Sequence, residues 1–557
     1  MGSLTDHGAG IAVVSAGPEP DIDGGLSSGS RRAYCVDLRG DPGRRDRAPG
    51  LPLSEGVESM DVPAEPRARN LNRRKVLRRG AVAAGAALVA GPFAGFAART
   101  ALAEQDSTSK KGRSLQPIPD EADGEVRLWL PEGFRYRSFH DTEVPVTLDD
   151  GTKLPGRHDG MAAFKGDNGN VVLIRNHEVN GAGPAFGPGD PYDPMARGGA
   201  TTVEVTPTGE VVTAHTSLNG TMMNCSGGPM PWGSWVTCEE TVNGPDVGPD
   251  FTGAPNTSLT QRHGFVFEVP VDGDSSREPI TKAGRFAHEA VAFDPKDGIL
   301  YLTEDNFGFA SGFYRYLPGD NPMRTGRLDN HGRLQMLAVK AEPNAHLEAS
   351  QRPGASRRVE WVDIDDPDPS FPYTPGQEAP TSNNDAIAYV GQQGREQGAA
   401  QFSRLEGAVY DHGVVYFTST QGGGPAEEGA GPIADGYGNG HGQIWAYHTQ
   451  SQTLQLVYES PGPDTLDFPD NVTTSPRGAL VVCEDNTEDN YLRGLSRSGE
   501  LFDIALNRLV GRDGTPRHDD EFAGSTFSPY GDTLFVNIQA GAGMTFAIWG
   551  PWHKIGL

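Results

Sequence analysis

The chain has 557 residues, 36% of them hydrophobic, and carries a formal net charge of −27 at pH 7. A surface this acidic repels nucleic acids and anionic membranes, so neither is an expected partner. The 74 glycines and 44 prolines follow no collagen-like period, which predicts many short elements joined by turns rather than long helices.

The N-terminal region carries a predicted export signal. Basic residues between positions 73 and 79 precede a weakly hydrophobic, Ala/Gly-rich run over 80–98, and small residues at 101–103 offer a cleavage site. This order predicts a twin-arginine signal peptide over residues 70–103, which exports proteins already folded. The apolar run is short and rich in glycine, which disfavours the alternative of a stable membrane anchor.

Residues 1–69 form a leader without a periodic apolar pattern. Met60 lies a usual distance ahead of the signal, so this leader is either a disordered segment or the product of a mis-assigned start. Residues 104–557 are predicted to form a single domain with 33 basic and 63 acidic residues, a net charge of −30. If its substrate is anionic, local positive charge is needed, and bound cations could supply it.

Six segments of this predicted domain share one pattern, in which a turn is followed by a β-rich run and then by acidic or amide residues. The turns contain Gly, Asp, Asn or Pro, and the runs are rich in residues that strands prefer. These segments are 164–178, 229–240, 293–306, 410–421, 475–486 and 528–539. Alternating segments that predict further strands lie between them, at 263–273, 311–320, 442–452 and 490–501.

The spacing of the repeated segments predicts the fold. Their ends at Glu178, Glu240, Asp305, Gln421, Asp485 and Gln539 are separated by 62, 65, 116, 64 and 54 residues. The long interval contains a Pro/Asp-rich stretch over about 341–400, which we expect to be an insertion. Repeats of short strands that close into a ring describe a β-propeller. We therefore predict an all-β fold, a six-bladed β-propeller with insertions and an active-site mouth at one end of its central channel; a β-sandwich is the alternative.

Equivalent strand ends in such a ring converge on one mouth. Carboxylates crowded there repel one another unless cations neutralise them. Oxygen ligands suit hard cations such as calcium. The strand ends that would meet are Asn176-His177-Glu178, Glu239-Glu240, Glu304-Asp305 and Glu484-Asp485-Asn486.

Three further segments offer candidate ligands. GRFAHEA places His288 and Glu289 just before a strand, and DFPDN (467–471) offers Asp and Asn oxygens. FSRLEG places Arg404 and Glu406 on the same face of an extended segment. The Arg404 guanidinium could form an ordinary salt bridge or grip a phosphate through two hydrogen bonds. The predicted domain over 104–557 has no phosphate-binding glycine loop, HExxH or GxSxG motif, which argues against the P-loop, zincin and α/β-hydrolase classes.

The predicted domain contains three cysteines, so at least one thiol has no disulfide partner. Cys225 lies in NCSGGP, a turn before a strand. Cys238 and Cys483 occupy matching positions of two repeats, where small buried hydrophobic residues are expected.

Several motifs together resemble the PhoX-type alkaline phosphatases, an exported, calcium- and iron-dependent family. They are NCSGGPMPWGSWVTCEE, RNHE, GRFAHEA, FSRLEGAVY, DFPDN, VVCEDN and FAGSTFSPYGDTLFVNIQ, spread between about residues 120 and 550. The resemblance implies a six-bladed propeller whose mouth holds an iron–calcium cluster that hydrolyses phosphate monoesters. Met230 and Tyr530 stand where the family motifs often carry Thr or Asp.

The resemblance also implies roles for individual residues. Arg404 would be catalytic and hold the phosphate, while Cys225 would bind iron as a thiolate, since soft sulfur suits iron better than calcium. The other implied metal ligands are Glu239, Glu240, Glu289, Glu406, Asp470, Asn471 and Glu484. Residues expected near the cluster are Asn176, Glu178 and His288.

Two other functional classes stay open from the sequence. One is a non-catalytic secreted propeller stabilised by calcium, and the other is a phosphodiesterase or lactonase on the same scaffold. The expected partners are a small phosphoester substrate and the twin-arginine export machinery, with no nucleic acid and no stable membrane anchor. We expect a secreted monomer that contains Ca²⁺ and Fe³⁺.

Overall fold

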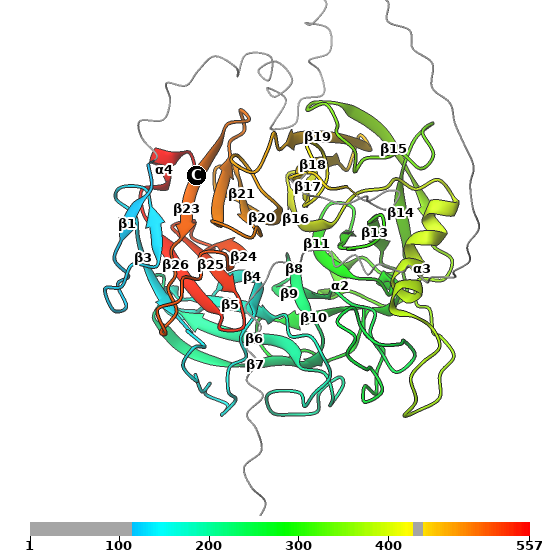
Figure 1. The fold of residues 1–557 in the computed structure, drawn as a ribbon, viewed down its shortest axis with the longest axis horizontal. Coiled ribbons are helices and arrows are strands. Elements are labelled where there is room, and N and C mark those ends of the chain that lie inside the picture. Colours follow the sequence, from blue (N-terminus) through cyan, green and yellow to red (C-terminus); the bar gives the residue numbers. More distant parts are fainter. Residues whose placement is uncertain (1–113, 427–437) are drawn as a thin grey trace, which may run out of the picture.

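The computed structural model describes residues 114–426 and 438–557. The predicted leader and signal peptide therefore lie outside the described residues. Within the described part, the chain forms five antiparallel sheets arranged around a common centre (Figure 1). The prediction of an all-β, propeller-like fold is confirmed. None of the described helices is long and apolar enough to span a membrane.

Strands adjacent in a sheet are mostly adjacent in the chain. The first sheet contains β4 (His158–Lys165), β5 (Val171–His177), β6 (Gly198–Val205) and β7 (Val211–Thr221). The second contains β8 (Asn224–Met230), β9 (Ser234–Glu239) and β10 (Val266–Pro270). The third contains β11 (His288–Asp294), β12 (Ile299–Glu304), β13 (Phe313–Leu317), β14 (Arg333–Val339), β15 (Ser356–Asp363), β19 (Thr453–Glu459), β18 (Gln443–His448), β17 (Val414–Ser419) and β16 (Leu405–Asp411).

Two more sheets complete the ring. One contains β20 (Pro469–Thr474), β21 (Leu480–Glu484), β22 (Tyr491–Leu495), β23 (Leu501–Asn507), β2 (Leu128–Leu130) and β1 (Gln116–Ile118). The other contains β24 (Glu521–Phe527), β25 (Thr533–Gln539), β26 (Met544–Trp549) and β3 (Arg135–Phe139). The described α-helices are α2 (Pro322–Thr325), α3 (Asn383–Glu396) and α4 (Trp552–Ile555).

The repeated segments of the sequence are strands in the structure. The six segments with acidic or amide ends contain β5, β9, β12, β17, β21 and β25, and the alternating segments contain β10, β13, β18 and β22. The β16–β17 hairpin shows the local cause: His412 and Gly413 have φ values of 47° and 87°. A two-residue turn with both residues left-handed matches the twist of paired strands.

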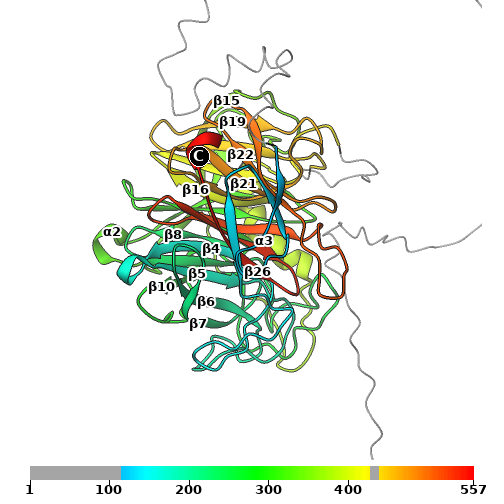
Figure 2. The ribbon, with the colours of Figure 1, turned by 90° about the vertical axis from the view of Figure 1, so that its left-hand side faces the viewer.

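Six strands form an inner circle, and Figure 1 shows them around the middle of the ring. Each contacts the next one, and the last contacts the first. In order around the ring they are β4, β8, β11, β16, β20 and β24. Figures 1 and 2 place β7 on the opposite side of the ring from β15 and β19.

The number of sheets differs from the six separate blades predicted, because β15 joins two groups of strands. β15 pairs with β14 through residues such as Leu337 and Trp361, and with β19 through Arg357 and Leu454. Both β15 and α3 lie within the expected insertion at 341–400. The strands that follow β10 therefore form one nine-stranded sheet up to β19.

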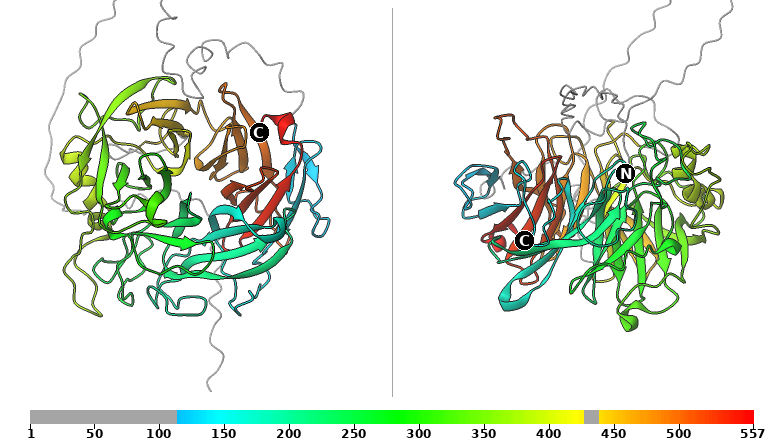
Figure 3. Two further views of the ribbon diagram at one scale, coloured as in Figure 1. Left: turned by 180° about the vertical axis from the view of Figure 1, so that it is seen from behind. Right: turned by 90° about the horizontal axis from the view of Figure 1, so that it is seen from below.

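The ring is completed by strands distant in the sequence. β3 pairs with β26 over five residues, from Arg135–Trp549 to Phe139–Thr545. Figure 3 shows this from behind, with the N-terminal strands in blue beside the C-terminal strands in red. Buried side chains form the core; within the nine-stranded sheet, for example, the Phe313 ring of β13 and the Phe417 ring of β17 stack with centroids 4.3 Å apart.

Candidate metal centre

All six inner strands carry a bulge at an equivalent place. At each bulge, two consecutive residues face a single residue of the neighbouring strand, which bends the strand and re-aims its side chains. The first residues of these bulges, on β4, β8, β11, β16 and β20, are Asp159, Cys225, Glu289, Glu406 and Asp470. Four carboxylates and one thiol are thus brought to the middle of the ring by one repeated backbone feature. On the sixth inner strand, β24, the first residue of the bulge is Gly524, so this strand contributes no ligand side chain there.

Side-chain hydrogen bonds from adjacent sheets hold these bulges. In four cases the donor is a side chain on the strand that follows one inner strand in the chain. The acceptor is the backbone carbonyl of the bulge residue on the next inner strand around the ring. The donor–acceptor pairs are Asn176 and Cys225 (2.9 Å), Thr303 and Glu406 (2.6 Å), Thr418 and Asp470 (2.7 Å), and Asn537 and Asp159 (2.5 Å). Asn176, which we predicted to lie near the cluster, therefore supports the backbone of Cys225.

Left-handed backbone precedes four of the inner strands. Arg157, Met223, Arg404 and Phe468 have φ between 45° and 49°. Such conformations are costly in non-glycine residues and persist where the surrounding structure holds them. The Met223 carbonyl accepts a hydrogen bond from the Glu240 backbone N–H at 2.9 Å. This contact fixes the end of β9 against the start of β8.

The central cluster consists of Cys225, Glu240, Glu289, Glu406 and Asp470. One ligand atom from each of Cys225, Glu240 and Glu289 lies within 4.8 Å of the other two, and the same holds for Glu289, Glu406 and Asp470. All five side chains are buried. Glu289 belongs to both groups and so stands at the centre of the cluster.

The electrostatics of this cluster are unfavourable in the protein alone. Burial and the charges of Glu240 and Asp470 raise the pKa of Glu289 well above its usual value. Burial and the charges of Asp305 and Glu289 do the same to the pKa of Glu406. Among the described residues, no hydrogen-bond donor reaches Glu289 Oε2. Buried like charges of this kind are stabilised by bound cations.

Cys225 supplies the only sulfur of the cluster. Its thiol donates a hydrogen bond to the His288 carbonyl at 3.1 Å, and burial with the charges of Glu289 and Glu240 raises its pKa well above the usual value. The three cysteines in the described part of the chain are all free and buried. Cys238 and Cys483 stand opposite the bulges of β8 and β20, outside the two ligand groups.

Arg404 borders the cluster. Its Nε and one terminal nitrogen contact both carboxylate oxygens of Asp305, at 3.2 and 3.1 Å, and that terminal nitrogen also bonds Glu406 at 2.8 Å. The guanidinium carbon lies 4.8 Å from the centroid of the Phe307 ring. The side chains of Arg404 and Glu406 lie on the same side of the chain, as predicted, and contact each other. The backbone of Arg404, however, is left-handed rather than extended. The structure thus shows a salt bridge that fixes the guanidinium beside the cluster.

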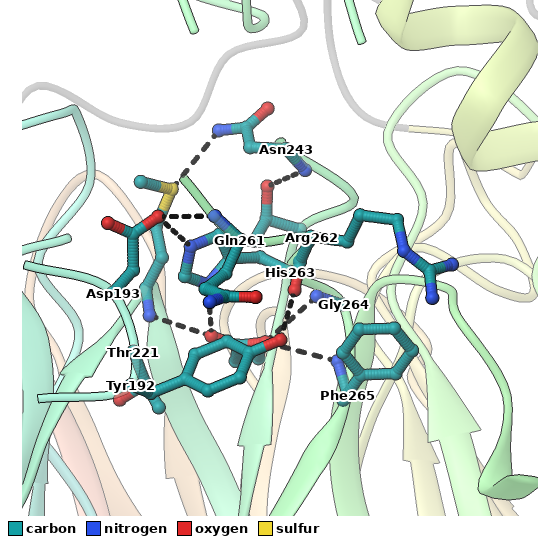
Figure 4. A network of polar contacts seen from close by, with 12 residues as sticks. Tyr192, Asp193, Thr221, Asn243, Gln261, Arg262, His263, Gly264 and Phe265 are labelled. Carbon is teal, nitrogen blue, oxygen red and sulfur yellow. Dashed lines mark hydrogen bonds and ion pairs between the residues drawn. The ribbon is translucent and has the colours of Figure 1, made fainter. Parts of the chain in front are cut away.

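Glu239, a predicted metal ligand, lies outside the two ligand groups and takes part in a separate polar network around Asp193 and His263, which Figure 4 shows. Its carboxylate accepts hydrogen bonds from His263 Nδ1 at 2.6 Å and from the backbone N–H groups of Met222, Gly264 and Phe265. Asp193 lies 3.5 Å from the other ring nitrogen of His263. We call Asp193, His263 and Glu239 the Glu239 network. Burial alone would lower the pKa of His263, but the charges of Glu239 and Asp193 raise it to about 9.

Glu484 is likewise engaged elsewhere. Its carboxylate accepts hydrogen bonds from Arg493 Nε at 2.9 Å and from the backbone of Asp467 and Tyr491. Burial nevertheless raises the pKa of Glu484 to about 7. Neither Glu239 nor Glu484 is in the two ligand groups, because other donors already occupy their oxygens.

The other predicted residues lie around the cluster. Asn471 donates to Asp470 Oδ1 at 2.8 Å and accepts from the Gly524 backbone N–H at 2.6 Å. The Glu178 carboxylate forms an ion pair with Arg157. The His288 ring stacks on Phe286, and its Nε2 is 2.9 Å from the Gly284 carbonyl. All of these predicted residues are buried.

Sequence reasoning did not select two residues at this centre. Asp159 raises the pKa of both Glu289 and Cys225 and is held by Gln539 Nε2 at 2.6 Å. Asp305 was recognised only as a strand end, yet it binds Arg404. A comparison of the first strands would have found Asp159, because His158-Asp159-Gly160 aligns with His288-Glu289-Ala290.

An all-β ring with a buried thiol and carboxylates at its centre defines a propeller-like protein with a candidate metal centre. The model of the family described as "Alkaline phosphatase PhoX" matches residues 114–217 and 208–542. The chain therefore belongs to the PhoX family and is an alkaline phosphatase. No curated protein matches its sequence.

The chain is similar to several solved structures, of which one supports the fold. PhoX of Pseudomonas fluorescens in complex with vanadate, a transition state analogue, has 17% identity and a TM-score of 0.55, covering 79% of this chain and 98% of the other. A gluconolactonase of Xanthomonas campestris has 10% identity, coverage of 80% and 99%, and a TM-score of 0.37. Virginiamycin B lyase of Staphylococcus aureus has 10% identity, coverage of 75% and 99%, and a TM-score of 0.34. Only the first similarity is close enough to support the fold.

Proposed function

We propose that this alkaline phosphatase hydrolyses phosphate monoesters at a metal cluster in the middle of the ring. The observation that carries the proposal is the convergence of Cys225, Glu240, Glu289, Glu406 and Asp470 beside a fixed guanidinium. Hydrolysis breaks the bond between phosphorus and the ester oxygen, transfers the phosphoryl group to water, and releases an alcohol and inorganic phosphate.

The residues present suit metal ions. Carboxylate oxygens favour calcium, and the Cys225 sulfur favours iron. The crowded acids have raised pKa values, and one oxygen of Glu289 has no hydrogen-bond donor. Both observations support the binding of positive ions at this place. In this proposal, the five cluster residues hold an iron–calcium cluster, with Asp159 and Asn471 at its edge. Glu239, Glu484, Asn176, Glu178 and His288 position the backbone and side chains around it.

Bound cations would neutralise the carboxylates and polarise the phosphoryl group. Arg404 would orient the phosphate through its planar guanidinium, which Asp305 and Glu406 already hold in place. A donor fixed before substrate arrives need not reorganise during the reaction, which makes its electrostatic contribution large. Asp305 therefore acts as a positioning residue for Arg404.

The proposal extends to the architecture and location of the protein. The six inner strands support a count of six blades, with β15 joining the third blade to the fourth. Residues 70–103 would serve as a twin-arginine signal, and residues 104–557 would form one secreted, monomeric domain.

The test uses the purified protein with its metals. Metal content by mass spectrometry is compared with turnover of 4-nitrophenyl phosphate, bis(4-nitrophenyl) phosphate and a lactone. Bound iron and calcium with preference for the monoester supports the proposal. Preference for the diester or the lactone would replace it with one of the other hydrolases, and a metal-loaded protein inactive on all three would favour a non-catalytic scaffold.

Arg404 variants test the phosphate clamp. We expect Arg404→Ala to lower kcat/KM for the monoester by roughly two or more orders of magnitude. Arg404→Lys should restore little, because one ammonium cannot reproduce a two-pronged contact. Turnover at the wild-type level in Arg404→Ala would exclude this role.

A further inference from the structure

A pocket opens beside the candidate metal centre. It encloses about 500 Å³ of space, including the open solvent at its mouth. Glu240 and Asp305 line it where β9 and β12 end. Because Glu240 belongs to the central cluster and Asp305 holds Arg404, one end of the pocket meets the proposed reacting groups.

The rest of the pocket is largely apolar. Its lining includes Phe251 from the β9–β10 connection, Phe307 and Phe309 from the β12–β13 connection, and Ile387 from α3. These side chains come from three separate segments of the chain. The pocket thus joins a charged end to an apolar end.

Two of the rings form a continuous aromatic path to Arg404. The Phe307 ring lies 4.8 Å from the Arg404 guanidinium, and its centroid is 6.4 Å from that of Phe251. Phe251 is 64% exposed, more than any other large hydrophobic residue of the described part. An exposed aromatic ring at the rim of a pocket marks a surface suited to binding an apolar ligand.

We propose that this pocket binds the leaving group of the substrate, and that the preferred substrates are phosphate monoesters of apolar, especially aromatic, alcohols. The inference rests on the proposed phosphatase function. With the phosphate beside Arg404, the ester oxygen carries its organic group along Phe307 toward Phe251. Burial of that group against the rings removes apolar surface from water and favours such substrates over polar ones.

The test compares two alkyl esters, 2-phenylethyl phosphate and glycerol 1-phosphate, whose leaving groups are both alkoxides. The measured quantity is the ratio of kcat/KM for the first ester to that for the second in the metal-loaded enzyme. We expect Phe251→Ser and Ile387→Ser to lower this ratio by about tenfold and about threefold, since each removes part of one apolar wall. Phe251→Leu should retain most of the preference.

Tyr530→Ser is the matched control, because Tyr530 is an exposed aromatic residue on another sheet's turn. It should leave the ratio unchanged. A ratio unchanged in Phe251→Ser, or lowered equally in the control, would overturn the proposal.

A binding measurement separates this inference from the proposed function. Calorimetry of the metal-loaded protein should show phenylphosphonate binding about tenfold more tightly than methylphosphonate, with the difference lost in Phe251→Ser. If the wild type binds with this preference but hydrolyses no monoester, the proposed function fails and the pocket stands. Equal affinities for the two phosphonates would overturn the pocket assignment whatever the activity.

Discussion

Glu239 and Glu240 are neighbours in the chain, yet their carboxylates lie in two buried regions of opposite character. In the Glu239 network, His263 and three backbone N–H groups compensate the carboxylate. In the central cluster, Glu240 faces Glu289 and the Cys225 thiol. Burial of an acid is therefore a weak sign of a metal ligand, and the useful sign is an acid placed against other acids.

The first prediction tests the central cluster. Glu289→Gln removes the carboxylate shared by both ligand groups. We expect bound metal to be lost and kcat/KM for a phosphate monoester to fall by at least about two orders of magnitude, because the cations and the charge stabilisation that they supply are lost together. Metal analysis and steady-state kinetics measure both effects.

Glu278→Gln, at an exposed glutamate, is the control and should retain metal and turnover. Full metal content in Glu289→Gln would show that the cluster is held in another way, and the contrast with the Glu239 network would no longer hold.

The second prediction concerns the Glu239 network. His263→Gln leaves buried Glu239 and Asp193 without their cation, and breaking a buried ion pair on one side costs about 3–5 kcal/mol. We expect the free energy of unfolding to fall by about this amount, while the folded variant keeps its metals. Denaturant unfolding and metal analysis measure the two effects. Unchanged stability together with loss of the metals in His263→Gln would contradict the prediction.

The third prediction is a pH dependence of the same network. The pKa of His263 is raised to about 9 in the folded protein, against 6.5 for an ordinary histidine. The stability from its charge is therefore fully present below pH 6.5 and is lost as the pH rises through 9. The difference in unfolding free energy between wild type and His263→Gln should shrink over this range in denaturant titrations. A difference that stays constant or grows would show that His263 is neutral in the folded state.

The smallest effect is expected at Cys483. This buried thiol lies opposite the bulge of β20, outside the ligand groups. Cys483→Ala should cost about 1 kcal/mol of stability and leave the metals in place. Cys225→Ala should instead lose iron, which elemental analysis would detect. Equal metal loss in the two variants would remove the distinction between a ligand thiol and a packing thiol.

The sequence predicted the repeated strands well, because turn residues and runs of β-forming residues are local signals. It did not predict that β15 would join two groups of strands, since the pairing of Arg357 with Leu454 links residues far apart in the chain. Local patterns contain no information about such partners.

The candidate site could be predicted in part for a similar reason. Motifs identified Cys225, Glu289 and Glu406, which the bulges bring together. Glu239 and Glu240 were both predicted as ligands of one site, but adjacent residues of a strand point to opposite faces, and only Glu240 lies in the central cluster. Which of the two faces the centre depends on His263, whose position only the folded chain reveals.

The pairing of β3 with β26 has a consequence for the order in which the protein folds during synthesis. The ribosome releases β3 early, but its partner strand is made more than 400 residues later, from Met544 to Trp549. β3 therefore waits for its partner strand until translation is nearly finished, and the sheet that contains β24, β25, β26 and β3 is completed last. The proposed metal cluster, whose ligands extend from Cys225 on β8 to Asp470 on β20, would accordingly be loaded late in biosynthesis.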